Sequence, residues 1–143
     1  MLTPYRVLAS VALIVLATVP ALAQPARPPV KIGLLMPYTG TLSVIGQDTT
    51  RGLELALGQS GGKAGGREVQ VIKEDTEAKP ATGLAKTRKV VENDRVDLLV
   101  GPVSSAVALA MEPYVRQHEI PLVIPVAFTR ELTAAARWSR PCT

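Results

Sequence analysis

Apolar residues gather in short runs along this chain, and the runs alternate with segments of helical spacing. Four runs rich in apolar and β-branched residues predict buried strands over residues 30–36, 68–75, 96–100 and 120–124. Between these runs, apolar positions recur every three to four residues and predict helices over residues 47–60, 80–93 and 104–118. Pro113 falls inside the last helix and is expected to kink or split it, since proline removes a backbone donor.

The alternation of strands and helices predicts an α/β fold. A β-α-β-α-β-α-β order favours a parallel, doubly wound sheet with right-handed crossovers and helices on both faces. Ligands of such sheets bind beyond the carboxyl ends of the strands. The segments expected at that edge are residues 37–46, 101–105 and 125–129, with residues 75–79 as a fourth candidate.

The first two dozen residues have a different pattern. Arg6 is followed by an uncharged, mostly apolar run over residues 7–19, then Pro20 and the small-x-small sequence that ends at Ala23. The run is shorter than the ~20 residues that span a bilayer. We therefore predict a cleavable secretory signal peptide over residues 1–23. The exported chain would be periplasmic and would begin with a proline-rich leader over residues 24–29.

Composition excludes several classes of protein. Apolar residues make up 47% and charged residues 20% of the 143, which is typical of a globular domain. The net charge of +4 is spread thinly and aromatic residues are only 3%, so nucleic acid is not an expected partner. The single Cys142 and the single His118 exclude an internal disulfide framework and a Cys/His zinc site. His118 is expected at a helix end, where it would interact with the helix dipole.

Signatures of enzymes on similar sheets are missing. There is no G-x-G-x-x-G sequence, and the glycine-rich residues 61–66 lack the spacing of a P-loop and predict a tight turn. No G-x-S-x-G elbow surrounds Ser104 or Ser105, and His118 is expected at the far end of their helix. The sequence therefore predicts a protein that is not an enzyme and needs no cofactor.

One acidic cluster remains, formed by Glu74, Asp75 and Glu77. Paired carboxylates can perform acid–base chemistry or hold a hard cation. Glu74 and Asp75, however, would point to opposite faces of a strand. This favours a solvated strand end over a metal or catalytic site.

Several stretches, in this order and spacing, resemble type I periplasmic solute-binding proteins of ABC importers, in particular the leucine/isoleucine/valine-binding group. The likeness runs over residues 30–136. It rests on VKIGLLMPYTG (30–40), GQ (46–47) with RG (51–52), GGREVQV (65–71), Asp75 with Pro80, VDLLVGPVSS (96–105), and IPLVIP (120–125) with ELT (131–133). It implies two α/β lobes that grip a small-molecule ligand between them and present the closed form to a membrane permease. Residues 30–136 would form part of the N-terminal lobe. The same fold also serves as the ligand-sensing domain of receptors and regulators, which is the alternative function.

The resemblance also implies the ligand contacts. The serine pair after the third strand would bind the carboxylate of an amino acid or related small acid, with Ser105 at the position of the usual hydroxyl and Ser104 beside it. A helix N-terminus favours an anion, which supports this role. A purely structural alternative, equally weighted, is that one serine caps the helix. Further contacts would fall on Val126, Ala127 and Phe128.

Two positions depart from the family pattern. Phe128 stands where amino-acid binders often have a small hydroxyl residue, which favours a more apolar or aromatic acid. Ile45 replaces an aromatic residue on the first loop, and Tyr38 lies nearby, where it could contact the ligand or pack under the loop.

The implied second lobe and its ammonium-binding group are not in this sequence. Residues 137–143 read as a truncated or frameshifted tail. Without a second lobe, ligand binding should be weak or undetectable, and the fourth strand should be exposed at the sheet edge.

Overall fold

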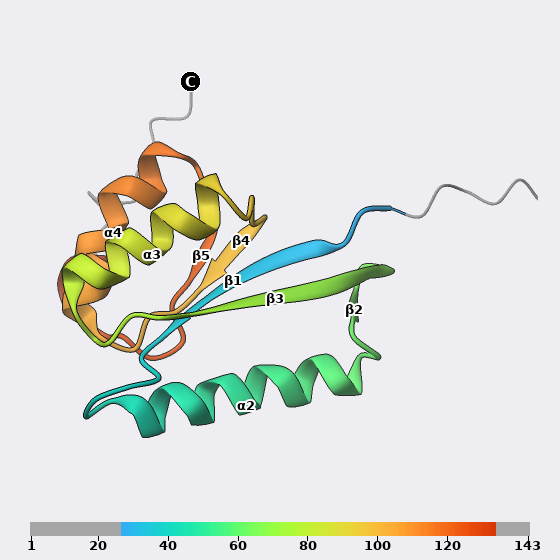
Figure 1. Ribbon diagram of the computed structural model, residues 1–143, viewed down its shortest axis with the longest axis horizontal. Helices are drawn as coiled ribbons and strands as arrows, with labels where there is room; N and C mark the ends of the chain where they lie inside the picture. Colours follow the sequence, from blue (N-terminus) through green and yellow to red (C-terminus); the bar gives the residue numbers. More distant parts are fainter. Residues whose placement is uncertain (1–26, 134–143) are drawn as a thin grey trace, which may run out of the picture.

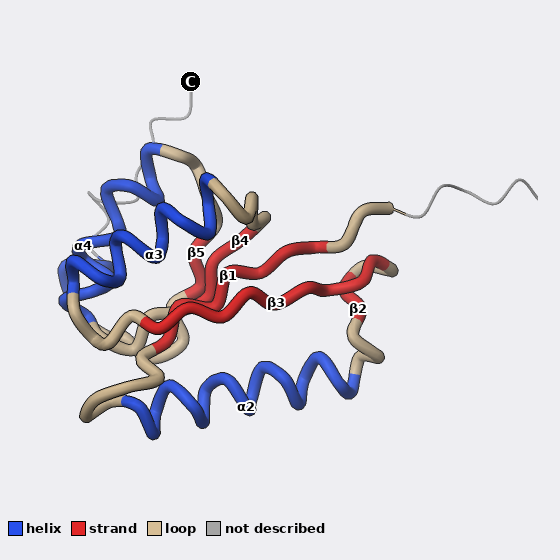
Figure 2. The backbone as a smooth tube through the Cα atoms, viewed as in Figure 1, coloured by secondary structure: helices blue, strands red, loops and turns tan. Residues whose placement is uncertain are grey.

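The computed structural model describes residues 27–133, which form one sheet with helices on both faces (Figures 1 and 2). The sheet has five strands in the order β2-β3-β1-β4-β5. Its elements along the chain are β1 (Val30–Met36), α2 (Ser43–Gln59), β2 (Lys63–Ala64), β3 (Arg67–Asp75), α3 (Pro80–Glu92), β4 (Leu98–Val100), α4 (Ser105–Gln117), β5 (Leu122–Val123) and α5 (Arg130–Thr133). The predicted doubly wound α/β architecture is confirmed.

β1 is the central strand because its sequence is apolar on both faces. It pairs in parallel with β3, from Val30 opposite Val69 to Met36 opposite Asp75, and in parallel with β4 on its other side. Leu34, Leu35 and Met36 are all fully buried. A strand covered on both sides needs this continuous apolar run rather than alternation.

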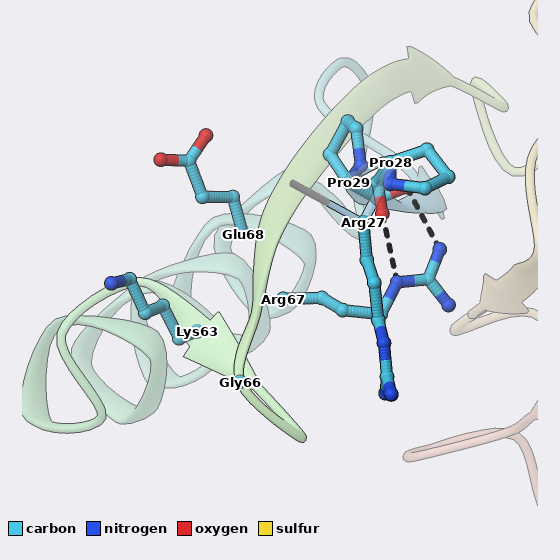
Figure 3. Close-up of a pocket in the computed structure, with 7 residues that line it drawn as sticks. All are labelled: Arg27, Pro28, Pro29, Lys63, Gly66, Arg67 and Glu68. Atoms are coloured by element: carbon cyan, nitrogen blue, oxygen red, sulfur yellow. Dashed lines mark hydrogen bonds between the residues drawn. The ribbon is translucent and has the colours of Figure 1, made fainter. Parts of the chain in front are cut away.

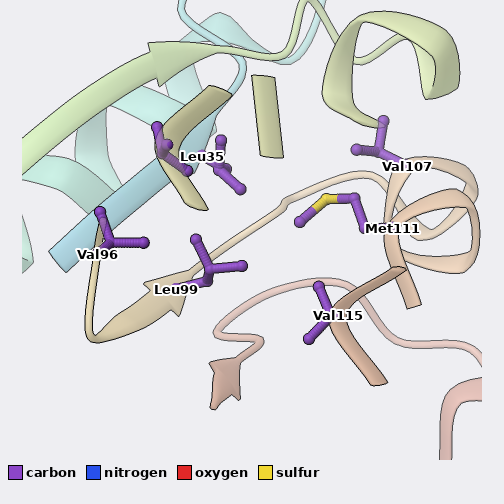
Figure 4. Packing of buried hydrophobic residues seen from close by; sticks show 7 residues of the cluster. Leu35, Val96, Leu99, Val107, Met111 and Val115 are labelled. Carbon is purple, nitrogen blue, oxygen red and sulfur yellow. The ribbon is translucent and has the colours of Figure 1, made fainter. Parts of the chain in front are cut away.

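The two faces of the sheet are covered by different helices (Figure 1). Helices α3 and α4 lie together on one face and α2 lies on the other. The main core lies under α3 and α4 and is drawn in Figure 4; its buried members are Leu35, Val90, Val96, Leu99, Val107, Met111 and Val115. The smaller cluster of buried residues on the opposite face consists of Leu34, Met36 and Val103. Neighbouring residues of β1 thus face opposite layers, as the strand period requires.

Three details differ from the sequence-based expectations. Helix α2 begins at Ser43, four residues before the predicted start. Residues 61–66 form a turn plus the short strand β2, which pairs antiparallel with β3 through a hairpin whose Gly65 and Gly66 have φ of 56° and 77°. Positive φ at both central positions is what a two-residue hairpin turn needs.

Of the two alternatives predicted at Pro113, the split is wrong and the kink stays a prediction. Helix α4 continues through it from Ser105 to Gln117. Pro113 is on the exposed side of the helix, while Val107, Met111 and Val115 are buried on the other side. These buried residues lie both before and after Pro113 in the sequence. Their packing stabilises the helix despite the loss of one backbone hydrogen bond at the proline.

Some predicted segments lie outside the described residues. These are the signal peptide over residues 1–23, part of the leader, and the tail over residues 137–143. Within residues 27–133, no helix is long and apolar enough to cross a membrane.

Candidate functional site

Four loops meet at one edge of the sheet. Because β1, β3, β4 and β5 are all parallel, their carboxyl ends lie at the same edge. We call this the carboxyl edge; it is formed by residues 37–42, 76–79, 101–104 and 124–129. All the segments that the sequence predicted for this edge are therefore brought together there.

The serine pair lies at the start of α4. Ser105 is the first residue of the helix and Ser104 is its N-cap, with φ −79° and ψ 125°. Both side chains are half-buried. Ser104 makes no side-chain capping bond, and within the described residues neither serine hydroxyl has a hydrogen-bond partner. The alternative in which the Ser104 hydroxyl caps the helix is therefore not what the structure shows.

Gly101 sets the path of the chain into the serine pair. Its φ is +124°, and a Cβ built on it would lie 2.1 Å from the carbonyl oxygen of Leu35. Its N–H donates to the carbonyl of Val123 at 2.9 Å. Only glycine combines this backbone conformation with so close an approach. The loop after β4 therefore contacts the backbone of both β1 and β5 before α4 begins.

Asp75, at the end of β3, is bonded to the neighbouring loops. Its Oδ1 accepts the N–H of Tyr38 at 2.9 Å and the N–H of Glu77 at 2.8 Å, and its Oδ2 accepts the Thr39 hydroxyl at 2.8 Å. Partial burial raises the pKa of Asp75, but these hydrogen bonds outweigh it and hold the pKa below its usual 3.8. Asp75 is therefore ionised near neutral pH.

The predicted solvated acidic cluster is wrong for two of its three members. Glu74 is 8% exposed and accepts from Lys86 at 2.7 Å and from Lys89, on the face covered by α3. Asp75 is half-buried on the loop side, and Glu77 alone is exposed, where it pairs with Lys79. Within residues 27–133, no three His, Cys, Asp or Glu side chains are grouped so as to hold a metal ion.

The aromatic candidates differ in exposure. The Tyr38 hydroxyl bonds with Thr50 of α2 at 2.9 Å, and its ring packs against the cluster under α2. Burial raises the pKa of Tyr38. Of the two alternatives for Tyr38, the structure favours packing under the loop. Phe128 is 88% exposed, and Ile45 is 42% exposed.

The remaining two candidates follow β5. Val126 is half-buried and packs against Leu34, Met36 and Val103. Ala127 is half-buried beside it. Val126 therefore anchors the loop that carries Phe128.

His118 lies at the helix end, as predicted. It is the C-cap of α4, and its ring lies 4.0 Å from the ring of Tyr114. Burial, with a hydrogen bond to Glu92, raises the pKa of Tyr114 to about 12. The full length of α4 separates His118 from Ser104 and Ser105, so the described chain forms no serine–histidine pair.

A hollow of about 420 Å³ lies at the opposite, amino edge of the sheet (Figure 3). It is lined by Arg27, Pro28, Pro29, Lys63, Gly66, Arg67 and Glu68. Arg67 closes one side by donating to the carbonyls of Pro28 at 2.8 Å and Pro29 at 3.3 Å. The hollow is therefore distinct from the carboxyl edge where the sequence predicted the site.

A family model described as "periplasmic binding protein" matches residues 29–139, which is most of the chain. The chain belongs to the periplasmic binding protein family. Among its relatives is the Leu/Ile/Val-binding protein BraC3 of Rhizobium johnstonii, 30% identical over 115 residues; the match covers 79% of this chain and 31% of the relative. The family resemblance drawn from the sequence is confirmed.

Solved structures of this family share the fold. An ABC transporter substrate-binding protein from Sphaerobacter thermophilus is 38% identical with a TM-score of 0.74, over 78% of this chain and 30% of that protein. A solute-binding protein of an ABC transporter from R. palustris, in complex with benzoate, is 41% identical with a TM-score of 0.67, over 69% and 28%. This chain thus spans about a third of the length of these periplasmic binding proteins. They are named as transporter proteins, and the periplasmic binding protein described here is likewise not an enzyme.

Proposed function

We propose that this chain belongs to the substrate-binding component of an ABC importer, which captures a small carboxylate in the periplasm and delivers it to a membrane permease. The carboxyl edge is the proposed binding surface. The observation that carries the proposal is the pair of half-buried serine hydroxyls at the start of α4, neither of which has a hydrogen-bond partner within the described residues.

The start of α4 suits a carboxylate for two reasons. The first backbone N–H groups of a helix have no partner within the helix, and the helix dipole is positive at this end. The hydroxyls of Ser104 and Ser105 add donors at the same place. A ligand carboxylate could accept from both kinds of donor, and these charge-assisted hydrogen bonds are the stronger kind.

The rest of the ligand is proposed to be apolar. Exposed apolar side chains near this edge include Phe128, Ile45 and Val44. An aromatic ring that is 88% exposed offers a face for stacking against a second ring. The benzoate bound by the R. palustris relative and the amino acids named for BraC3 both combine a carboxylate with an apolar body. Phe128 leads us to favour an aromatic carboxylate.

Transport, rather than sensing, is the role we favour. The relatives reported above are named as binding proteins, two of them of ABC transporters. The predicted signal peptide over residues 1–23 supports a periplasmic location. Sequencing the amino terminus of the exported protein should show Gln24 as its first residue. Retention of Met1 in the cytosolic fraction would contradict the proposal.

The ligand class can be tested by calorimetric titration of the purified protein that includes the second lobe implied by the family resemblance. Benzoate and L-leucine supply the carboxylate, and benzamide is the matched probe that lacks its charge. We expect benzoate to bind and benzamide to bind much more weakly. The change Ser105→Ala should weaken benzoate by about 1–3 kcal/mol if its bond is buried. Equal affinity of Ser105→Ala and the unsubstituted chain would remove this serine from the site.

A further inference from the structure

The carboxylate of Asp75 bridges two of the loops at the carboxyl edge. Through Tyr38 and Thr39 it contacts the loop that follows β1, and through Glu77 it contacts the loop that follows β3. The backbone ladder between the two strands ends close by, with the N–H of Thr76 donating to the carbonyl of Met36 at 3.0 Å. Beyond that bond, the side chain of Asp75 continues the connection.

Both loops have conformations that need such support. Glu77 and Ala78 have φ of 52° and 54°, which side chains other than glycine rarely adopt. The N–H of Glu77 in this strained turn is held by Asp75 Oδ1. In the other loop, Gly40 has φ of 77° and nothing lies within 4 Å of the position of its Cβ. The Gly40 carbonyl accepts the N–H of Ser43 at 3.2 Å, and the bonds from Tyr38 and Thr39 to Asp75 hold the base of the loop.

An indirect role for Asp75 follows from its bonding and its charge. Its two oxygens already accept three hydrogen bonds from the loops, so little acceptor capacity remains for a ligand. The hydrogen bonds that lower its pKa keep it negatively charged. A ligand carboxylate in direct contact with this charge would be repelled. Asp75 is thus suited to act on the loops rather than on the ligand.

We propose that Asp75 is a positioning residue: its carboxylate locks the loop after β1 against the loop after β3, so that the carboxyl edge is already ordered before a ligand binds. This inference rests on the proposed function, solute binding at that edge. Preorganisation improves affinity because a loop that is already ordered loses less conformational entropy when the ligand binds.

Four variants separate this role from a general effect on stability. Asp75→Ala removes all three bonds. Asp75→Asn keeps one oxygen that can accept both N–H groups, and its amide can donate to the Thr39 hydroxyl. Glu74→Gln is the matched control, because it alters the neighbouring carboxylate, which faces Lys86 and Lys89 and not the loops. Thr39→Val, at an exposed position, removes only the bond to Oδ2 and serves if Asp75→Ala does not fold.

The first measurement is amide hydrogen exchange of the ligand-free chain. The N–H groups of Tyr38 and Glu77 should exchange roughly tenfold faster in Asp75→Ala, as expected for the loss of hydrogen bonds to a charged acceptor. They should stay close to the unsubstituted rates in Asp75→Asn and Glu74→Gln. In Thr39→Val, the loop after β1 loses one of its bonds to Asp75, so the N–H of Tyr38 in that loop should exchange faster. The N–H of Glu77, in the loop after β3, should not. Unchanged exchange in Asp75→Ala, or equal acceleration in Glu74→Gln, would overturn the proposal.

The second measurement is the affinity for benzoate. Asp75→Ala should bind about tenfold more weakly, whereas Asp75→Asn should restore most of the affinity and Glu74→Gln should not lower it. Faster loop exchange with unchanged affinity would overturn the positioning role. If the unsubstituted protein that includes the second lobe implied by the family resemblance binds neither benzoate nor L-leucine, the proposed function is contradicted, and with it the role of Asp75 in binding.

Discussion

At the carboxyl edge of the sheet, backbone packs closely against backbone, whereas the turns at the amino edge are open. A Cβ added to Gly46 would lie 2.0 Å from the carbonyl oxygen of Pro37, and one added to Gly101 would lie 2.1 Å from that of Leu35. At the amino edge, nothing lies within 4 Å of the corresponding positions on the turn glycines, which are Gly61, Gly62, Gly65 and Gly66. Gly46 and Gly101 therefore have a different physical role from the amino-edge glycines, whereas Gly40 in the loop after β1 is as open as they are.

Polar groups differ between the edges in the same way. At the amino edge they are bonded to the chain itself: Arg67 donates to Pro28 and Pro29, and Asp97 accepts the N–H of Lys31 at 2.7 Å. At the carboxyl edge the hydroxyls of Ser104 and Ser105 have no such partner within the described residues. The start of α4 thus has hydroxyl donors available, and the close packing of Gly101 just before it can hold those donors in place for a ligand.

The largest effect on stability is expected from Gly101→Ala. Its new Cβ would collide with the backbone of β1, which cannot move without disturbing the central strand, and the φ of +124° would be strained as well. We expect the free energy of unfolding to fall by about 3 kcal/mol or more, measured by urea denaturation.

Gly66→Ala is the matched control at the amino edge. It has the same positive sign of φ, +77°, but open space around the Cβ position. Only the backbone strain remains, so the loss should be about 1 kcal/mol. Equal losses at the two glycines would mean that close packing does not distinguish the edges.

An intermediate effect is expected from pH, through the carboxylates at the end of β3. Burial raises the pKa of Glu74, but Lys86 and Lys89 outweigh it and hold it below its usual 4.5. The folded chain therefore binds fewer protons than the unfolded chain in this range. The stabilisation is present above about pH 4.5 and is lost as the pH falls through the lowered pKa. Asp75 should act in the same direction, because its pKa is also held below its usual 3.8.

Glu74→Gln tests this pH dependence. It should remove about 1 kcal/mol of stability at neutral pH, a modest value because the side chains of Lys86 and Lys89 are 37% and 47% exposed to solvent. It should also flatten the fall in stability below pH 4.5, measured by urea denaturation at several pH values. An unchanged slope would show that Glu74 is not the group that titrates.

The sequence predicts the strands well where burial leaves little choice. The run over residues 30–36 is apolar at nearly every position, and β1 has the same bounds. The start of α3 at Pro80 follows from the tolerance of proline in a first helical turn. The location proposed for the site also follows from topology, since parallel strands bring their carboxyl ends to one edge.

What the sequence misses depends on contacts between distant residues. Glu74 and Asp75 look like a polar strand end, but α3 supplies two lysines to one and the loop after β1 supplies donors to the other. The early start of α2 at Ser43 is a similar case. Gly46, inside that first turn, packs on Pro37, a contact that local propensity does not reveal. β2 has only two residues, too few for any pattern.

A smaller effect is expected from Arg67→Met at the amino edge. The variant keeps much of the apolar stem but removes the bonds to the carbonyls of Pro28 and Pro29, which are exposed to solvent. The free energy of unfolding should fall by about 0.5–1 kcal/mol, and affinity for benzoate should not change. Lys63→Met, which alters another cation of the same hollow, is the control. A loss of benzoate affinity in Arg67→Met would place part of the site at the amino edge and contradict a binding surface confined to the carboxyl edge.

The smallest effect on stability is expected from Phe128→Ala, because the ring is 88% exposed and contributes little to the core. Its unfolding free energy should stay within about 0.5 kcal/mol of the unsubstituted chain. Its affinity for benzoate, in contrast, should fall, since stacking between aromatic rings contributes about 0.5–1.5 kcal/mol beyond the area buried. Affinity for L-leucine should fall less, because leucine has no ring to stack. Titration of Phe128→Ala and Phe128→Leu with both ligands separates the contribution of ring stacking to the affinity from that of apolar area, because leucine keeps apolar area but has no ring. Equal losses for the two ligands would mean that Phe128 supplies apolar surface only and does not select an aromatic acid.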